Sequence, residues 1–433
     1  MTRLTKLACL ILCGPLSWAG PVWADAVTDW NDIANVAVAA GRPGPSGALD
    51  LALVQAAVHD AVQAIDHRYE PYFAEVPGAS GSRRAAVAAA AYGVLVAFYP
   101  TQAVSLDTSY NAYLANNGLT GNPGVVVGQK VAAMIVPLRR LVPSTFPPFI
   151  GGTNAGQWRP TESFLPGPPA SFSAMAVPWM AESDPFTLTG PARFRAEPPP
   201  ALTSNRYRID YDEVKAYGAL ASTVRSPQQT DVAYFWSENF LAQWNRALRA
   251  IASSNVPKLG DNARLFALAN LAVADAVITA WDSKKFYFIW RPLTAIREGN
   301  SDGNPNTVGD PTWQSLINNP NYPDYTSGAN NVTGAMTQVL ALFFGTDRMT
   351  FQVTSNAPLA VQKTRTYNRF SDAAQEVVDA RVFLGIHFRF ADTAARTQGR
   401  RVARWVVGHY LLPIDDDRHG DGRHHDDDRR DND

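Results

Sequence analysis

The sequence has almost no cysteine: among 433 residues, only Cys9 and Cys13 are present. Both lie in residues 1–24, so a mature chain without this stretch would have none, which excludes disulfides, thiolate metal sites and a cysteine nucleophile. The chain also has no large excess of positive or negative charge, since its formal net charge is -1. No overall field would recruit nucleic acid or an anionic membrane, so any anion site must be local.

Residues 1–24 have the pattern of a secretory signal peptide. Arg3 and Lys6 precede an apolar run over residues 7–16, and residues 22–24 form a small-residue cleavage pattern. The run is too short for a membrane anchor, and no later apolar run reaches spanning length. We therefore expect an exported protein, periplasmic or secreted, without a membrane span.

Sustained period-2 alternation is almost absent, and helical periodicity predominates. Residues 25–142 are predicted to form an N-terminal helical lobe, with helices over 48–66, 83–98, 105–118 and 125–141.

A change of composition follows this lobe. Residues 143–205 contain 13 of the 31 prolines and should form a long irregular connecting segment, whose aromatic side chains indicate that it packs on the body. Residues 206–414 are predicted to form a C-terminal helical lobe, and the charged residues 415–433 a disordered tail. The predicted fold class is all-α, with two helical bundles joined by the Pro-rich segment.

Local signals place several helices of the second lobe. Ser226, Pro227 and Gln229 form a capping-box pattern that predicts a helix over 226–252. A long apolar helix is predicted over 262–285.

Three short segments of this lobe concentrate groups that an oxyanion needs. In the first, Lys284 and Arg291 are seven residues apart, or nearly two helical turns, so both long cations could reach one point. Pro292 suggests that their helix ends there. Taken alone, such a pair more often caps carbonyls or faces water.

In the second segment, Thr326-Ser327-Gly328 precedes an amphipathic helix that ends at Gly345. The free backbone amides at a helix start make a ready anion site, and the Ser327 hydroxyl adds a donor. Simple N-capping is the default interpretation of this motif by itself.

In the third segment, Arg381 and His387 are six residues apart and do not share a helical stripe, so Arg381 would have to reach in from a bend. A lone histidine in an apolar run is more often a hydrogen-bonded core residue than a ligand. The folded body has only four histidines, which limits the candidates for a metal ligand or a covalent intermediate: His59, His67, His387 and His409.

The order of these segments is more specific than any one of them. Lys-x6-Arg-Pro, a Ser-Gly at a helix start and Arg-x5-His together resemble the active-site signature of the vanadium-dependent haloperoxidases and the type 2 phosphatidic acid phosphatase (PAP2) superfamily. Runs such as "ALVQAAVHDAVQAIDHRYEPY" and "DPTWQSLINNPNYPDY" are similar to bacterial members of the haloperoxidase branch. The resemblance covers most of residues 28–412.

The resemblance implies a vanadate ion, with phosphate as a competing oxyanion, in a cage of cations and donors. Lys284, Arg291 and Arg381 would neutralise its oxygens, while Ser327 and the Gly328 amide would donate hydrogen bonds. His387 would coordinate vanadium or, in a phosphatase, become the phosphohistidine. Hydrogen peroxide would bind, Lys284 would polarise it, and a halide would attack to give a hypohalous species for a small organic acceptor. A homo-oligomer is compatible with the resemblance.

One position departs from the family pattern, which is Pro-Ser-Gly-His. Here Ala329 stands in place of the acid/base histidine, and Thr326 in place of the proline. Losing acid/base help typically costs about 10² to 10⁴ in rate while leaving an anion cage intact. A water or another side chain could handle protons, and His59, His67, Asp324 and Asn330 are candidates. Three functions therefore stay open: a haloperoxidase, which we favour, an acid phosphatase, and an oxyanion-binding protein with little or no catalysis.

Overall fold

The computed structural model describes residues 25–141, 143, 145–163 and 173–414. The signal peptide expected over 1–24 and the tail expected over 415–433 lie outside the described residues. Within the described part the fold is mostly helical, with 13 α-helices and one two-stranded sheet. The all-α prediction is confirmed.

Five helices lie within residues 25–142: α1 (Ala26–Gly41), α2 (Gly47–Asp66), α3 (Arg83–Phe98), α4 (Ala103–Asn116) and α5 (Pro123–Ile135). The sequence did not predict α1. The alanine-dense α3 lets α5 approach closely, since a Cβ on Gly128 would lie 2.3 Å from the Ala86 carbonyl oxygen. Two short 3₁₀ turns complete this part, η1 (Pro100–Gln102) and η2 (Val136–Leu138).

The connecting segment has little regular structure, as its proline content predicts. Its described residues contain one short 3₁₀ helix, η3 (Pro178–Glu182). The segment nevertheless packs on the body: Trp158, Trp179 and Phe186 are buried. The Asp275 carboxylate on the long helix accepts from the Phe186 amide at 2.6 Å, which fixes the segment there.

Eight helices follow: α6 (Asn205–Tyr217), α7 (Pro227–Phe235), α8 (Phe240–Asn255), α9 (Leu259–Tyr287), α10 (Pro292–Arg297), α11 (Gly328–Phe343), α12 (Phe370–Phe383) and α13 (Arg389–His409). A 3₁₀ turn, η4 (Gly299–Ser301), follows α10. The capping box at Ser226 and Gln229 is present. The single helix predicted over 226–252 is wrong, because the chain breaks after α7 and the Asn239 side chain caps α8.

A hairpin that the sequence did not predict joins α11 to α12. Its strands, β1 (Arg348–Thr354) and β2 (Thr364–Arg369), are antiparallel. Phe351, Val353 and Tyr367 are buried on one face of the hairpin. The strands carry several arginines and threonines, so their alternation is short and weak in the sequence.

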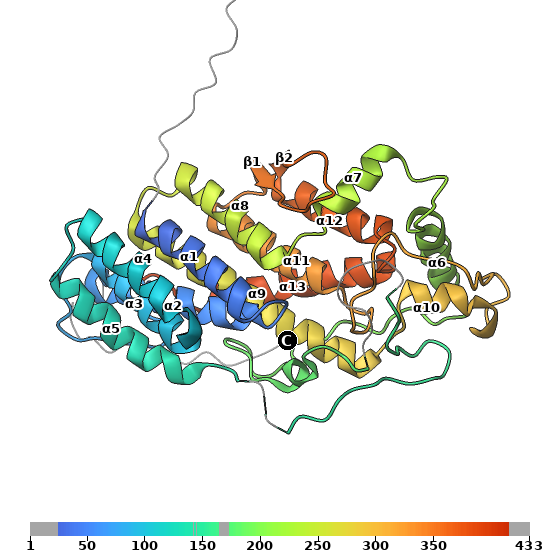
Figure 1. Ribbon diagram of the computed structural model, residues 1–433, viewed down its shortest axis with the longest axis horizontal. Helices are drawn as coiled ribbons and strands as arrows, with labels where there is room; N and C mark the ends of the chain where they lie inside the picture. The colour runs from blue at the N-terminus through green and yellow to red at the C-terminus, as the bar shows by residue number, and fades with distance from the viewer. Residues whose placement is uncertain (1–24, 142, 144, 164–172, 415–433) are drawn as a thin grey trace, which may run out of the picture.

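The long helix α9 runs through the middle of the molecule, with α2 on one side and α11 and α13 on the other (Figure 1). The largest buried apolar cluster contains residues from every α-helix except α6 and α10, whose buried apolar residues form a second cluster. The core is therefore continuous from the N-terminal helices into the C-terminal ones, and α9 holds the elements of the site described below.

The expectation that no later apolar run reaches spanning length is wrong. By length and composition, α2 and α9 are both long and apolar enough to cross a membrane, and a third span would result if α3 and the bent segment Pro100–Asn116 counted as one. In the fold, 94% of the apolar window of α2 and of α9 is buried inside the protein. Helices that are apolar all round occur both in membranes and in the cores of large proteins.

Candidate active site

Lys284 and Arg291 do not share one helix, and this prediction is wrong. Helix α9 ends at Tyr287, and Phe288 has a left-handed conformation with φ of 34° that turns the chain. Arg291 is the N-cap of α10, and Pro292 begins that helix instead of ending the previous one, as its fixed φ and missing N–H favour. Both cations are nonetheless fully buried and reach the same loop.

That loop, residues 322–324, presents its carbonyl oxygens to the cations. Lys284 Nζ donates to the carbonyls of Pro323 at 2.6 Å and Asp324 at 3.1 Å. Arg291 Nε donates to the Tyr322 carbonyl at 2.8 Å. The loop leading to α11 is thus held by one charge from the end of α9 and one from the start of α10.

His387 lies in the turn between α12 and α13, and its two ring nitrogens have different neighbours. Nδ1 lies 2.7 Å from Asp324 Oδ1. Nε2 lies 3.2 Å from Arg291 Nη1, which also donates to the Ile386 carbonyl at 2.6 Å. A carboxylate on Nδ1 orients the ring and favours the tautomer in which Nε2 carries a lone pair.

Burial and neighbouring charges keep this histidine neutral. Burial lowers the pKa of His387 well below its usual value, and Arg291, Lys284 and Arg381 lower it further. Burial raises the pKa of Asp324 to about 7, although Arg291 and Lys284 oppose that rise. The Nε2 lone pair faces Arg291 Nη1 in this arrangement. A neutral imidazole can act through such a lone pair as a nucleophile or as a metal ligand.

Two guanidinium nitrogens at this site are buried without a partner among the described residues: Arg291 Nη2 and Arg381 Nε. Arg381 comes from the last turn of α12, where its Nη1 donates to the Trp236 carbonyl at 3.3 Å. Burial lowers the pKa of Arg381 to about 10. Unpaired donors on buried cations are costly, and an anion between them would satisfy both.

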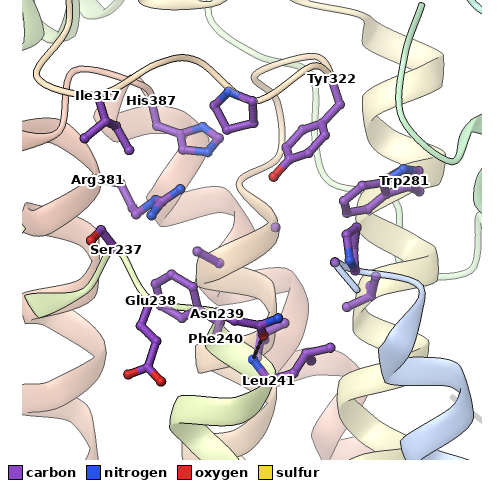
Figure 2. A pocket seen from close by; sticks show the side chains of 17 residues that line it. Ser237, Glu238, Asn239, Phe240, Leu241, Trp281, Ile317, Tyr322, Arg381 and His387 are labelled. Atoms are coloured by element: carbon purple, nitrogen blue, oxygen red, sulfur yellow. Dashed lines mark hydrogen bonds between the residues drawn. The ribbon is translucent and has the colours of Figure 1, made fainter. Parts of the chain in front are cut away.

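A cavity of about 290 Å³ opens beside these groups. Gly328, Ala329, Arg381 and His387 are among the residues that line it. Figure 2 shows His387 above Arg381, with Tyr322 and Trp281 across the cavity. The remaining wall is largely apolar and contains Phe240, Leu241, Val277, Trp281, Ile317 and Val332.

Ser327 is the N-cap of α11, but its side chain makes no capping hydrogen bond, so the default interpretation of this motif as a simple cap is wrong. Asn330 Nδ2 lies 3.5 Å from Ser327 Oγ and donates to Asp392 Oδ1 at 2.8 Å. Burial raises the pKa of Asp392 well above its usual value. The serine thus turns toward a buried polar network at the helix start.

The structure brings together Lys284, Arg291, Arg381 and His387 through direct contacts or a shared cavity, and it places Gly328 on that cavity. Their roles toward an anion stay predictions. Of the four proton-handling candidates, Asp324 contacts His387 and Asn330 contacts Ser327. His59 bonds the Glu70 carbonyl in the N-terminal lobe, and neither His59 nor His67 lines this cavity.

Sequence reasoning missed two groups at the site. Tyr322 lies in the run that carries the Ser-Gly motif, but nothing in its spacing distinguishes it from neighbouring aromatics. Asp392 follows His387 by five residues and lies in the first turn of α13. A carboxylate is common at this position because it interacts favourably with the helix dipole, so the sequence gives no sign of a role in the site. Only the fold shows that these two side chains adjoin the cations.

Comparisons with known proteins point in one direction. Residues 264–416 match the family described as the VCPO second helical-bundle domain. Vanadium chloroperoxidase of Curvularia inaequalis is 28% identical over 297 residues, which is 53% of this chain and 48% of that protein. The match therefore spans about half the length of the curated relative.

Solved structures share the fold over nearly the whole chain. The first bacterial vanadium-dependent iodoperoxidase superposes with a TM-score of 0.75 at 22% identity, covering 89% of this chain and 97% of its own. A holo-type bacterial vanadium-dependent chloroperoxidase gives 0.70 at 17% identity, covering 89% and 97%. At such identities the likeness shows the fold alone. The matched domain and the similar chloroperoxidase sequence agree with this fold: the chain is related to the vanadium haloperoxidases, in sequence over residues 264–416 and in fold over nearly the whole chain.

Proposed function

We propose that the protein binds vanadate at His387, with phosphate as a competing oxyanion, and uses hydrogen peroxide to oxidise a halide. The observation that carries the proposal is the pair of buried, unpartnered nitrogens, Arg291 Nη2 and Arg381 Nε, beside a neutral histidine. A fold gains nothing by burying such donors empty, whereas an oxyanion with several acceptor oxygens would satisfy both.

Each residue has a definite part in this proposal. His387 would hold the ion through Nε2, while Asp324 keeps the ring oriented through Nδ1. Arg291 and Arg381 would neutralise the charge on its oxygens, and the Gly328 amide would donate at the start of α11. When bound, vanadate supplies the centre at which peroxide is activated.

Lys284 would have to be protonated to contact the anion. Its Nζ already donates to two loop carbonyls, so only the protonated ammonium has a third N–H for the anion. Burial and Arg291 lower its pKa well below the usual value, and an anion in the cavity would favour the charged form again. Lys284 would therefore become protonated as the anion binds and would add a positive charge to the site.

The cavity suits the proposed substrates. Its mouth can admit hydrogen peroxide and a halide, and the apolar wall with Trp281 and Phe240 would accept a small organic molecule.

Ala329 supports a second function, binding of an oxyanion with little turnover. It lies on the cavity, where a methyl group cannot move a proton. The related acid phosphatase, acting through a phosphohistidine at His387, would suffer more, because its leaving group needs a proton donor.

The test uses the purified mature protein and orthovanadate. Isothermal titration should show one site per chain, inorganic phosphate should compete, and the loaded protein should brominate a phenol dye when peroxide and bromide are present. Phosphate-ester hydrolysis, assayed in parallel, separates the phosphatase function. The variant His387→Ala should lose all activity. Tight binding without either activity would support the binding protein, and absence of vanadate binding by the parent protein would sink the proposal.

We also propose that the chain is exported to the periplasm or secreted, as the sequence of residues 1–24 indicates. Expression of the full chain followed by N-terminal sequencing of the mature product should find cleavage near Ala24.

A further inference from the structure

Ala329 has no proton to donate, so any side chain that donates a proton to a bound anion must be another polar residue of the cavity wall. At the far end, Glu238 pairs with Arg246 at 2.6 Å. The Asn239 side chain caps α8. Ser237 donates to the Tyr234 carbonyl at 2.8 Å. These groups are already committed to holding the loop between α7 and α8.

Tyr322 lines the same cavity as Ala329 and His387, and the cations of the site hold it in place. Its ring centroid lies 4.9 Å from Lys284 Nζ and 4.9 Å from the guanidinium carbon of Arg291. The Trp281 ring lies 5.0 Å away. The ring position is thus set by the residues that would hold the anion.

The hydroxyl end of this ring points into the cavity. Figure 2 shows it in the space between Arg381 and Trp281, on the side that faces His387 and Arg381. The electrostatics agree: burial lowers the pKa of Arg381, and Tyr322 is the largest opposing influence, ahead of Asp392. The hydroxyl therefore lies close to the cation that borders the cavity.

We propose that the Tyr322 hydroxyl replaces the histidine missing at position 329, as the hydrogen-bond and proton donor to the bound oxyanion. This inference rests on the proposed function, because it needs an anion beside His387. A phenol can both donate and accept a hydrogen bond, and tyrosine serves as a general acid or base elsewhere.

The proton transfer balances without any further reagent. The O–H bond of Tyr322 would break and an O–H bond would form on an oxygen of the anion, while Arg381 and Arg291 would stabilise the phenolate. Water returns the proton, and no electrons are gained or lost.

The variant Tyr322→Phe tests this, since it keeps the ring that lies against Lys284 and Arg291 and removes the hydroxyl, which also interacts with Arg291. Tyr325→Phe is the matched control: Tyr325 lies three residues away, is buried, and donates its hydroxyl to the Glu197 carbonyl, outside the cavity. Thermal melting of both variants checks the fold. The readout is the dissociation constant for orthovanadate and for inorganic phosphate, measured by titration calorimetry.

Tyr322→Phe should weaken the binding of both anions by about 10- to 100-fold, the value of a hydrogen bond to a charged group. Tyr325→Phe should leave it unchanged. Adding Ala329→His to Tyr322→Phe should restore most of the affinity.

Equal affinities of the parent protein and Tyr322→Phe would overturn the inference and leave the proposed function standing. An equal loss in Tyr325→Phe would also overturn it, because the effect would then not come from the cavity. If the parent protein binds neither anion, the proposed function fails and the inference fails with it.

Discussion

Replacing Arg381 by methionine should stabilise the anion-free protein and weaken its anion binding. Burial lowers the pKa of this guanidinium from 12.5 to about 10. Because the folded state disfavours the charged form, the cost is present at neutral pH and disappears only as the pH rises past about 10. A difference of this size corresponds to roughly 3 kcal/mol.

Methionine also removes favourable contacts, which reduces the gain. The hydrogen bond from Arg381 Nη1 to the Trp236 carbonyl is long, at 3.3 Å, and contributes about 1 kcal/mol. The guanidinium also lies 5.3 Å from the Phe240 ring, a contact worth about 0.5 to 1 kcal/mol. The expected net effect is a rise of about 1 kcal/mol in the free energy of unfolding, which is a small upward shift of Tm.

Differential scanning calorimetry with and without orthovanadate measures both effects. The anion-free Tm of Arg381→Met should equal or exceed that of the parent protein, while the upward shift that orthovanadate produces should shrink, because the variant binds it about 10-fold or more less tightly. The comparison variant is Arg365→Met. Arg365 pairs with Asp231 at 2.8 Å and with Glu376 at 3.6 Å, so its loss leaves these two carboxylates without this cation and should lower Tm. If Arg381→Met lowers the anion-free Tm as much as Arg365→Met does, Arg381 is a structural cation and the reasoning fails.

Two further predictions concern charge at the site. Lys284→Gln should weaken orthovanadate binding about 10-fold in a titration, whereas Lys285→Gln, which removes the neighbouring, partly exposed cation paired with Glu182, should not; equal effects would refute a local role for Lys284. Burial raises the pKa of Asp324 to about 7, so its carboxyl is neutral below that pH and ionised above it. Affinity for sulfate should therefore fall as the pH rises from about 6 to about 8, and Asp324→Asn should flatten the profile; an unchanged slope in that variant would exclude Asp324 as the source.

Much of the fold could be read from the sequence because helix signals are local. The capping box at Ser226 and the apolar period of α9 depend on neighbouring residues only, and both were found. The break after α7 and the hairpin β1–β2 were missed, because they depend on tertiary partners. Pro292 was assigned to the wrong end of a helix, since proline is compatible with the residue after one helix and with the first residue of the next.

The site was predicted as a set of residues more than as a geometry. The order of three motifs singled out Lys284, Arg291, Arg381 and His387. Two of the local interpretations were nevertheless wrong: Lys284 and Arg291 do not share a helix, and Ser327 makes no capping hydrogen bond. The Asp324–His387 contact joins residues 63 apart in the chain, and no local pattern reports it. Tyr322 could not be singled out for the same reason: its place follows from cations contributed by the end of α9 and the start of α10.

The measurement that tests the central claim most directly is a crystal structure of the mature protein soaked with orthovanadate, with vanadium located by its anomalous signal. We expect a single strong peak in the cavity, bonded to His387 Nε2, with its oxygens contacting Arg291 Nη2 and Arg381 Nε. A fully ordered, empty cavity at saturating orthovanadate, or vanadium bound elsewhere with His387 unliganded, would contradict it.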